Sequence, residues 1–448
     1  MRALTEAVSR GEILAHGIGG RSDLPVAPWL ATYAGVAVVA VSFFVATALW
    51  AKPRWEGRPG EARLDVLGRI VDSALARASA RTLGVLLLVG FLVVGWMGPD
   101  DLGRANPAPT WFYAWFWVGL VPLSLLFGPV WKRLNPLRTI ASAASILNPA
   151  QVRLPQAVGM WPAVVGLVAF LWLELVYDGA ASPRTVAWFV FWYAVVQVVA
   201  GVVFGPRWFE RGDGFEVYST MVSRASPWGR DAHGRLVLRN PMRGIAETPA
   251  SPALTPVVVT VLGSTVFDGI SRSSWWAGRI ADTTRAEYLL VGTVGLAGAI
   301  AAVGATFGLA VALTRGFVAA DRANGRGVAA LFAPSLIPIA IGYTFAHYLS
   351  FAIFQGQQGY LLANDPLGRG WDLLGLTGRT VDYTIVTTSQ IAFLQIAAIV
   401  VGHVVAVLSA HDRSLAVLRR GDGMRGQYPL VLVMIAYTGG GIVLLAGG

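Results

Sequence analysis

The chain of 448 residues contains no cysteine, which excludes disulfide bonds, thiolate metal sites and cysteine nucleophiles. Charged residues are scarce: they make up 13% of the sequence, whereas a soluble domain typically has about 25%. Lysine is rarer still, because Lys52 and Lys132 are the only lysines among the 35 basic residues. Hydrophobic residues make up 55%, and the mean hydropathy is +0.58. This composition indicates an integral membrane protein.

Apolar stretches long enough to cross a bilayer, about 20 residues each, occur ten times. They cover residues 29–50, 82–99, 110–130, 158–177, 185–205, 252–270, 287–314, 328–354, 384–408 and 427–446. We therefore expect an all-α membrane protein in which residues 29–448 form one helical domain. Residues 1–28 have no apolar core, so we expect an extracytoplasmic tail there. Pro334, Pro338 and the glycines at 439–441 predict breaks in the eighth and tenth spans.

Basic residues are distributed unevenly over the loops between these stretches. The loops on one side are residues 51–81, 131–157, 206–251, 315–327 and 409–426, and they hold most of the arginines and both lysines. Because positive charge accumulates on the cytoplasmic side of membrane proteins, we expect this side to be cytoplasmic. The prediction is a multi-pass protein of the bacterial plasma membrane with both termini extracytoplasmic. This orientation explains the net charge of +10 without a nucleic-acid partner.

One pattern occurs twice between residues 111 and 272. Trp111, Trp115 and Phe127-Gly128-Pro129 recur, with the same spacing, as Trp188, Trp192 and Phe204-Gly205-Pro206. Each copy then has an Asn-Pro-x-Arg string, at Asn135 and Asn240, and ends in Asp-Gly, at Asp178 and Asp268. We expect two duplicated helical hairpins, at residues 111–182 and 188–272, related by a pseudo-two-fold axis along the membrane normal. The alternative is that Trp, Gly and Pro simply recur at helix ends, as they do in many membrane proteins.

Polar and ionisable side chains inside a bilayer are costly, so each is a functional candidate. The expected orientation places a set of them in the outer half of their spans, namely Glu174, Asp178, Asp268, His347, Gln355 and Gln390. We therefore predict an outward-facing polar pocket that binds a small solute or ion. The structural alternative is that the aspartates are turn residues and that His347 is a satisfied packing group.

The chemistry open to this set is limited. Carboxylates with imidazole suit a divalent metal ion, for which His16, Asp268 and His347 are the candidate ligands. The same groups could instead relay protons, or activate a metal-bound water for hydrolysis. His403 and His411 lie toward the inner end of the ninth span, where they could form a gate or the far end of a proton path.

Two arginines, Arg138 and Arg243, occupy equivalent positions in the Asn-Pro-x-Arg strings. Such residues at a membrane surface hold lipid phosphates or fix a loop onto the spans, and we expect the second role. No phosphate loop, nucleophile elbow or zinc-protease motif occurs in the sequence.

Several strings together resemble a poorly characterised family of polytopic actinobacterial membrane proteins. They are residues 15–25, the Phe-Gly-Pro and Asn-Pro-Leu-Arg strings at 127–138, Phe267-Asp268-Gly269, and His403 with residues 410–413. Some proteins of this kind carry the label fenitrothion hydrolase. The resemblance covers most of the chain and implies a membrane protein and the label of an organophosphate hydrolase, but it supplies no catalytic residues.

The sequence thus favours an integral membrane transporter or solute-binding protein for a cation or metal ion. One alternative is a membrane-embedded, metal-dependent hydrolase of esters or phosphotriesters. Another is a structural subunit of a larger complex, whose partners would be other membrane subunits. A transporter or hydrolase requires the polar groups to converge, whereas a structural subunit does not.

Overall fold

The computed structural model describes residues 28–55, 62–100, 106–147, 151–319, 327–419, 421 and 424–447. Within these residues, ten helices are long and apolar enough to cross a membrane. Each of them overlaps one of the ten predicted stretches, so the prediction of a helical membrane protein with about ten spans is confirmed. The predicted tail, including His16, lies outside the described residues except for Pro28.

Several of these helices expose large apolar side chains on one face. Leu86 and Leu87 in α4 (Ala74–Met97) and Val165 in α9 (Trp161–Leu175) are all exposed by more than half. In water, contiguous apolar surface of this kind would be unfavourable. Lipid tails are as apolar as leucine, so the same surface is stable in a bilayer.

The described chain forms two compact units. Unit 1 holds residues 64–223 and 348–386, and unit 2 holds the described residues of 28–63, 224–347 and 387–447. The helix α18 (Ile337–Leu362) contributes its first part to unit 2 and its second part to unit 1. The single domain that we expect over residues 29–448 stays a prediction.

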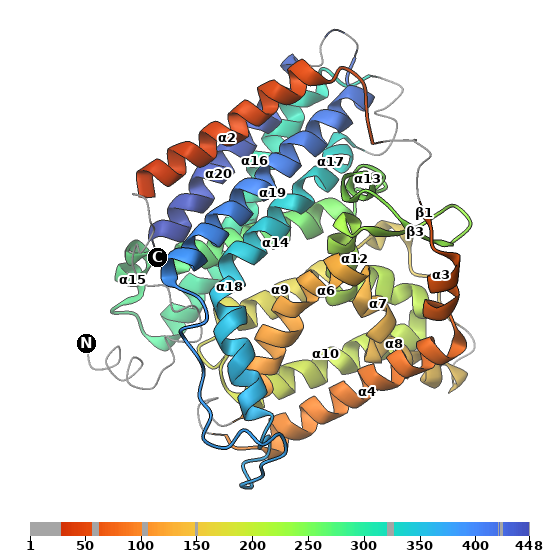
Figure 1. Cartoon of the computed structure of the whole chain (residues 1–448), viewed down its shortest axis with the longest axis vertical. Helices are drawn as coiled ribbons and strands as arrows, with labels where there is room; N and C mark the ends of the chain where they lie inside the picture. Colours follow the sequence, from red (N-terminus) through yellow and green to blue (C-terminus); the bar gives the residue numbers. More distant parts are fainter. Residues whose placement is uncertain are drawn as a thin grey trace. The chain divides into compact units, whose positions relative to one another are not determined.

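Unit 1 contains four of the candidate spans and a series of short helices around them. In chain order, its elements are α3 (Asp65–Val71), α4, α5 (Ala108–Thr110), the π-helix η2 (Trp111–Val118), α6 (Gly119–Phe127), α7 (Val130–Leu134), α8 (Pro136–Ala144), η3 (Ser145–Leu147), η4 (Gln156–Val158), α9, α10 (Pro183–Phe204), η5 (Pro206–Trp208), α11 (Phe209–Gly212) and α12 (Gly214–Val222). Helices α4, α8 and α10 lie side by side (Figure 1). An aromatic core joins η2, α9 and α12, where Phe170 packs between Trp117 and Phe215.

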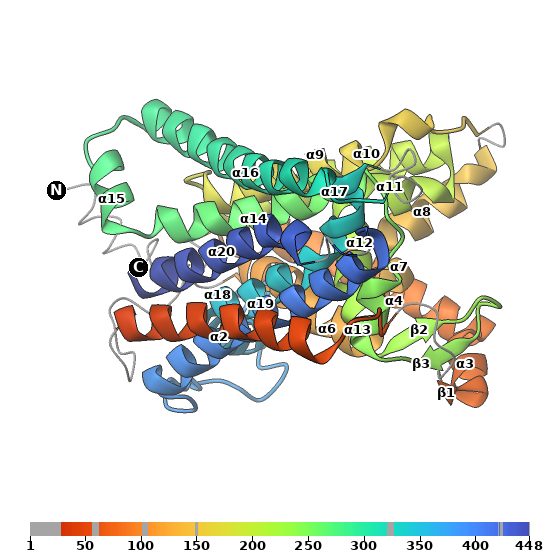
Figure 2. The ribbon, with the colours of Figure 1, turned by 90° about the horizontal axis from the view of Figure 1, so that it is seen from above.

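Unit 2 contains the remaining spans and a small sheet. Its elements are α2 (Pro28–Leu49), β1 (Ala62–Arg63), β2 (Trp228–Arg230), β3 (Leu236–Leu238), α13 (Pro241–Ala246), α14 (Leu254–Ser271), α15 (Ser274–Ile280), α16 (Arg285–Arg315), α17 (Val328–Phe332), η7 (Ala333–Leu336), the start of α18, α19 (Thr388–Val417), η8 (Arg425–Gln427) and α20 (Tyr428–Gly447); η6 (Ser223–Ala225) spans the boundary of the units. The sheet is antiparallel in the order β1-β3-β2. Helices α2, α19 and α20 pack together (Figure 1), and α16 runs along α14 (Figure 2).

The predicted break in the eighth span is present, but the one in the tenth span is absent. Pro334 lies in the 3-10 turn η7, and Pro338 is the second residue of α18, so the span consists of α17, η7 and α18. By contrast, α20 is continuous through the glycines at 439–441, and the prediction of a break there is wrong. Glycine keeps its backbone N–H, so unlike proline it weakens a helix without interrupting its hydrogen bonds.

The repeated strings have matching local conformations. Gly128 and Gly205 end their helices with φ angles of 79° and 78°, a left-handed region that favours glycine. Asn135 and Asn240 each cap the next helix, with proline as its first residue. The longer segments differ, however, because the first copy begins with a π-helix and the second does not. The duplication of whole hairpins therefore stays a prediction.

Within unit 2, α18 and α19 cross at two glycines. A Cβ atom on Gly342 would lie 2.5 Å from the carbonyl oxygen of Ala398 and 3.0 Å from the Cα atom of Gly402. A Cβ atom on Gly402 would in turn lie 2.7 Å from the carbonyl oxygen of Pro338. The backbones therefore touch, as is common where small residues face each other in membrane helices.

We predict that Gly342→Ala destabilises the protein by about 2 kcal/mol or more, because its methyl group would overlap backbone atoms that cannot move independently. Thermal unfolding of the purified protein in detergent measures the loss. Gly298→Ala in α16 is the matched control, since nothing lies within 4 Å of its Cβ position. The control variant should be as stable as wild type or more stable, because alanine is more favourable than glycine inside a helix by about 1 kcal/mol. Equal melting of both variants would contradict the close crossing.

Candidate functional site

Three ionisable side chains meet in unit 2, and we call them the Asp-Arg-His cluster: Asp268 of α14, Arg272, which directly follows α14 as its C-cap, and His347 of α18. Oδ2 of Asp268 contacts Nε2 of His347. The same ring nitrogen lies 2.7 Å from Nη2 of Arg272. Arg272 also pairs with Asp268 one turn away, at 3.3 Å between Nε and Oδ1. Asp268 and His347, two of the six residues predicted to share a pocket, are thus in contact, while the pocket itself stays a prediction.

The cluster lies mostly out of water. Asp268 is 3% exposed and His347 is 6% exposed, while the side chain of Arg272 is partly accessible. Ionisable groups at such positions in membrane-spanning helices are costly unless they are paired. Their mutual contacts therefore stabilise the cluster as a unit.

Tyr343 forms one wall of the cluster. It lies one helical turn before His347, and the two rings stack with centroids 5.5 Å apart and an angle of 16° between planes. Its hydroxyl lies against α14, where a Cβ atom on Gly269 would come within 2.9 Å of it. The glycine of the Phe-Asp-Gly string thus leaves space for Tyr343 beside Asp268.

The position of Nε2 of His347 has a chemical consequence. Arginine can only donate hydrogen bonds, and an ionised carboxylate can only accept them. Nε2 without a proton can accept from Arg272, and Nε2 with a proton can donate to Asp268, but it cannot do both at once. Whether Nε2 carries a proton, which depends on the tautomer and the charge of the ring, therefore determines which partner it binds.

A metal ion at this cluster has no support from the structure. Within the described residues, no group of three or more histidines, aspartates and glutamates is arranged to hold a metal. Arg272 explains why Asp268 and His347 do not form such a site: its guanidinium lies at the ring nitrogen that would coordinate the ion. The third predicted ligand, His16, lies outside the described residues.

The predicted acidic residues of unit 1 have different environments. Glu174 is buried in α9 and its Oε1 accepts a hydrogen bond of 2.9 Å from the hydroxyl of Tyr348. Asp178 is exposed in the turn after α9. Glu174 therefore remains a candidate site residue. The exposure of Asp178 in a turn fits the alternative that this aspartate is only a turn residue.

The predicted glutamines have mainly structural contacts. Gln390 is exposed and forms a capping box with Thr387 at the start of α19. Gln355 is partly buried in α18, beside Gly356, whose carbonyl accepts a hydrogen bond of 3.1 Å from the indole of Trp115. The capping contacts explain the position of Gln390 without a ligand.

The two histidines of α19 lie apart from each other and have separate partners. Nδ1 of His403 lies 2.8 Å from the carbonyl oxygen of Ile399, and its buried Nε2 has no hydrogen-bond partner among the described residues. His411 lies between Oε1 of Gln427, at 2.9 Å, and the carbonyl oxygen of Trp50, at 3.2 Å. His411 thus ties α19 to neighbouring segments, and the role of both histidines as a gate or proton path stays a prediction.

A second buried network, in unit 1, was not predicted from the sequence. Asp213 accepts hydrogen bonds from the Tyr193 hydroxyl at 2.7 Å, Asn135 Nδ2 at 2.7 Å, Trp131 Nε1 at 3.2 Å and the Phe215 backbone at 3.0 Å. Burial, followed by the nearby charge of Glu216, raises the pKa of Asp213 to about 6, and the donors oppose this rise. The sequence signal was an aspartate directly before a helix, which is typical of an N-cap.

Glu216 completes this network and explains the first of the two equivalent arginines. It accepts hydrogen bonds from Nε of Arg138 at 3.1 Å and from Asn135 at 3.0 Å, and it also pairs with Nη2 of Arg138. The second arginine, Arg243, pairs with Glu247 at 2.6 Å. Both arginines are thus neutralised by carboxylates of the protein, which favours the anchoring role over lipid binding.

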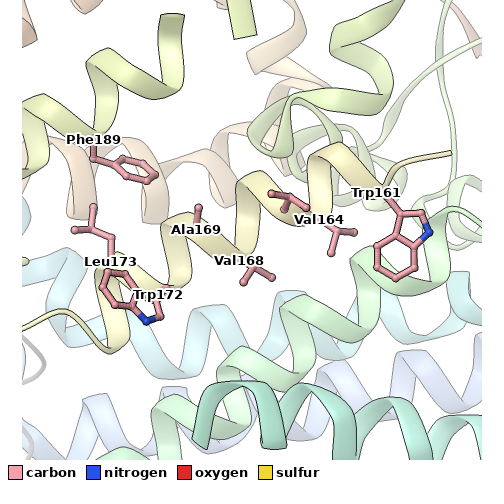
Figure 3. A pocket seen from close by; sticks show the side chains of 8 residues that line it. Trp161, Val164, Val168, Ala169, Trp172, Leu173 and Phe189 are labelled. Carbon is pink, nitrogen blue, oxygen red and sulfur yellow. The ribbon is translucent and has the colours of Figure 1, made fainter. Parts of the chain in front are cut away.

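A groove along α9 has a different character from the predicted polar pocket. Its volume is about 540 Å³, and it is lined by Trp161, Val164, Val165, Val168, Ala169, Trp172, Leu173 and Phe189 (Figure 3). The lining offers almost no polar atom to orient a solute or take part in a reaction. The Asp-Arg-His cluster therefore remains the best candidate for chemistry.

No family model, curated protein or solved structure matches this chain. The resemblance to actinobacterial membrane proteins is therefore neither supported nor contradicted.

We predict that Asp213→Asn destabilises the protein by about 2–3 kcal/mol, because the amide would place its own N–H groups against buried donors. The loss should appear as a lower midpoint of thermal unfolding in detergent. Glu210→Gln is the control, since Glu210 forms a half-exposed ion pair with Lys132 at 2.8 Å. Such pairs contribute about 0–1 kcal/mol. A small effect of Asp213→Asn would show that the network is dispensable.

Proposed function

We propose that this chain is an integral membrane transporter that couples the movement of a small ionic solute to protons at the Asp-Arg-His cluster. The observation that carries the proposal is the position of Nε2 of His347 between Asp268 and Arg272. Nε2 can accept from Arg272 or donate to Asp268, and protonating the ring leaves only the second arrangement, because both nitrogens then carry a proton.

The two arrangements differ in charge as well as in hydrogen bonding. With His347 neutral and its proton on Nδ1, the charges of Asp268 and Arg272 balance, and Nε2 accepts from the arginine. With His347 protonated, the cluster carries one positive charge and the ring donates to Asp268. An ionic solute would therefore bind the two arrangements with different affinity, which is the requirement for coupling.

The polar side chains on the helices around the cluster have other partners or are exposed. On α20, Tyr437 bonds to Thr306 of α16, and on α19, His403 bonds to Ile399. On α15, Arg279 is exposed. If the arginine-rich loops are cytoplasmic, α14 runs outward and carries Asp268 to the extracytoplasmic half of the membrane. The binding centre would then be open to the outside in one state of the transport cycle.

The duplication is part of this proposal. We infer that residues 111–182 and 188–272 are copies of one hairpin, supported by the matching glycine and asparagine conformations at their ends. Parallel repeats of this kind occur in transporters. The hydrolase alternative lacks a comparable observation, because the described residues offer no metal-binding group to activate water.

We predict that Asp268→Asn and His347→Gln each abolish proton-coupled solute movement. The protein would be reconstituted in liposomes adsorbed to a solid support, and ionic solutes would be applied with and without a pH gradient. For at least one solute, wild type should give a current that changes with the gradient. The variants should lower this current at least tenfold, because neither retains the two arrangements.

Glu287→Gln is the control, since Glu287 is a carboxylate of the same unit that caps the start of α16 in an exposed position. It should transport like wild type. A wild-type current that ignores the pH gradient would contradict proton coupling. A current that persists in both cluster variants would show that the binding centre lies elsewhere.

A further inference from the structure

The segment between α12 and α14 contains two neighbouring arginines in an ordered setting within unit 2. Arg224 lies in η6, and Arg239 directly follows β3. The strands β2 and β3 pair from Trp228 to Leu238, so the hairpin brings Arg239 back to the turn that contains Arg224. This segment belongs to the longest of the arginine-rich loops.

Arg239 is held in one position by the backbone around it. Its Nε donates to the carbonyl oxygen of Ser226 and its Nη2 to that of Arg224, both at 3.3 Å. Glycines make space for it: a Cβ atom on Gly229 would lie 2.6 Å from its Cδ, and one on Gly244 would lie 2.6 Å from its Cζ. The guanidinium of Arg239 is therefore fixed against the backbone of Arg224.

Arg224 has no such contacts. Its guanidinium makes no hydrogen bond or ion pair with any described residue, and it is only partly exposed. Burial, followed by the positive charge of Arg239, lowers the pKa of Arg224. Other arginines of the same loop have acidic partners, as Arg235 has Asp231 and Arg243 has Glu247.

A partly buried cation beside another cation, without a carboxylate of its own, is an unfavourable arrangement. A bound anion would remove the repulsion. Guanidinium groups bind phosphate through paired, charge-assisted hydrogen bonds, and a fixed guanidinium loses little freedom when it does so. The arrangement thus has the features of an anion site in which Arg239 is preorganised and Arg224 supplies free donors.

We propose that Arg224 and Arg239 form a binding site for a phosphate-type anion. The anion would be either the phosphodiester of an anionic lipid headgroup or free inorganic phosphate. The loop follows and precedes membrane-spanning helices and belongs to the side expected to be cytoplasmic, where anionic lipids attract basic segments. This site is separate from the Asp-Arg-His cluster and does not depend on the proposed transport activity.

The test is the melting temperature of the full-length protein in a neutral detergent. Short-chain phosphatidylglycerol, inorganic phosphate and chloride would each be added at equal ionic strength. The expected result is a rise of about 2–4 °C with one of the phosphate probes relative to chloride. A rise with phosphatidylglycerol alone identifies a lipid headgroup, and a rise with inorganic phosphate identifies the free anion.

Variants separate ligand binding from a purely structural role. Arg224→Gln should lose the rise, while Arg224→Lys should keep part of it, because lysine retains the charge but not the paired donors. Without a phosphate probe, Arg224→Gln should melt at or above the wild-type temperature, since the substitution removes a repulsive charge. Arg243→Gln is the control for general loss of positive charge and should respond like wild type.

Two results would overturn the proposal. One is a wild-type protein that neither phosphate probe stabilises beyond chloride. The other is an Arg224→Gln variant that either responds to the probes as wild type does or melts well below it without them. The second outcome would mean that Arg224 stabilises the fold through the protein itself.

Discussion

The contact between Asp268 and His347 joins α14 and α18 through two buried ionisable side chains of unit 2. It links the end of α14 to the middle of α18. Arg272 contacts the same nitrogen of His347, and Tyr343 stacks on its ring. Burial in an apolar helical environment is what makes this contact strong, because the groups have no water to bind instead. The arrangement of charge in this unit depends on it.

Two of the buried carboxylates, Asp213 and Asp268, have contrasting surroundings. Asp213 is surrounded by donors from four residues, so the carboxylate is well satisfied and the arrangement is rigid. Asp268 shares one histidine nitrogen with an arginine, so two partners compete for it. The first arrangement is typical of a structural element, whereas the second is typical of a group that changes state. The proposed function depends on the second arrangement.

Much of the fold could be predicted because a hydrophobic run of membrane length rarely forms anything but a spanning helix, and all ten runs overlap a helix. Asp268 and His347 were expected at a similar depth in their spans, and the two side chains are in contact. Arg272 was missed as a partner because it follows the apolar run, although a residue four positions after Asp268 lies on the same helix face. Asp213 and Glu216 were missed because contacts across distant segments, such as those with Asn135 and Arg138, leave no local pattern. The capping role of Gln390 could also not be separated from a binding role, since a capping residue and a ligand look alike in a sequence.

The length of α16 has a consequence for the membrane around the protein. The helix has 31 residues, which at about 1.5 Å per residue is about 46 Å, whereas the hydrocarbon layer of a bilayer is about 30 Å thick. An upright helix of this length would carry apolar turns into the headgroup region, so α16 must lean or the lipids beside it must stretch. Helix α16 packs along α14, which carries Asp268. A change in the tilt of α16 would therefore also act on α14. Bilayer thickness is therefore a variable to which this protein should be sensitive.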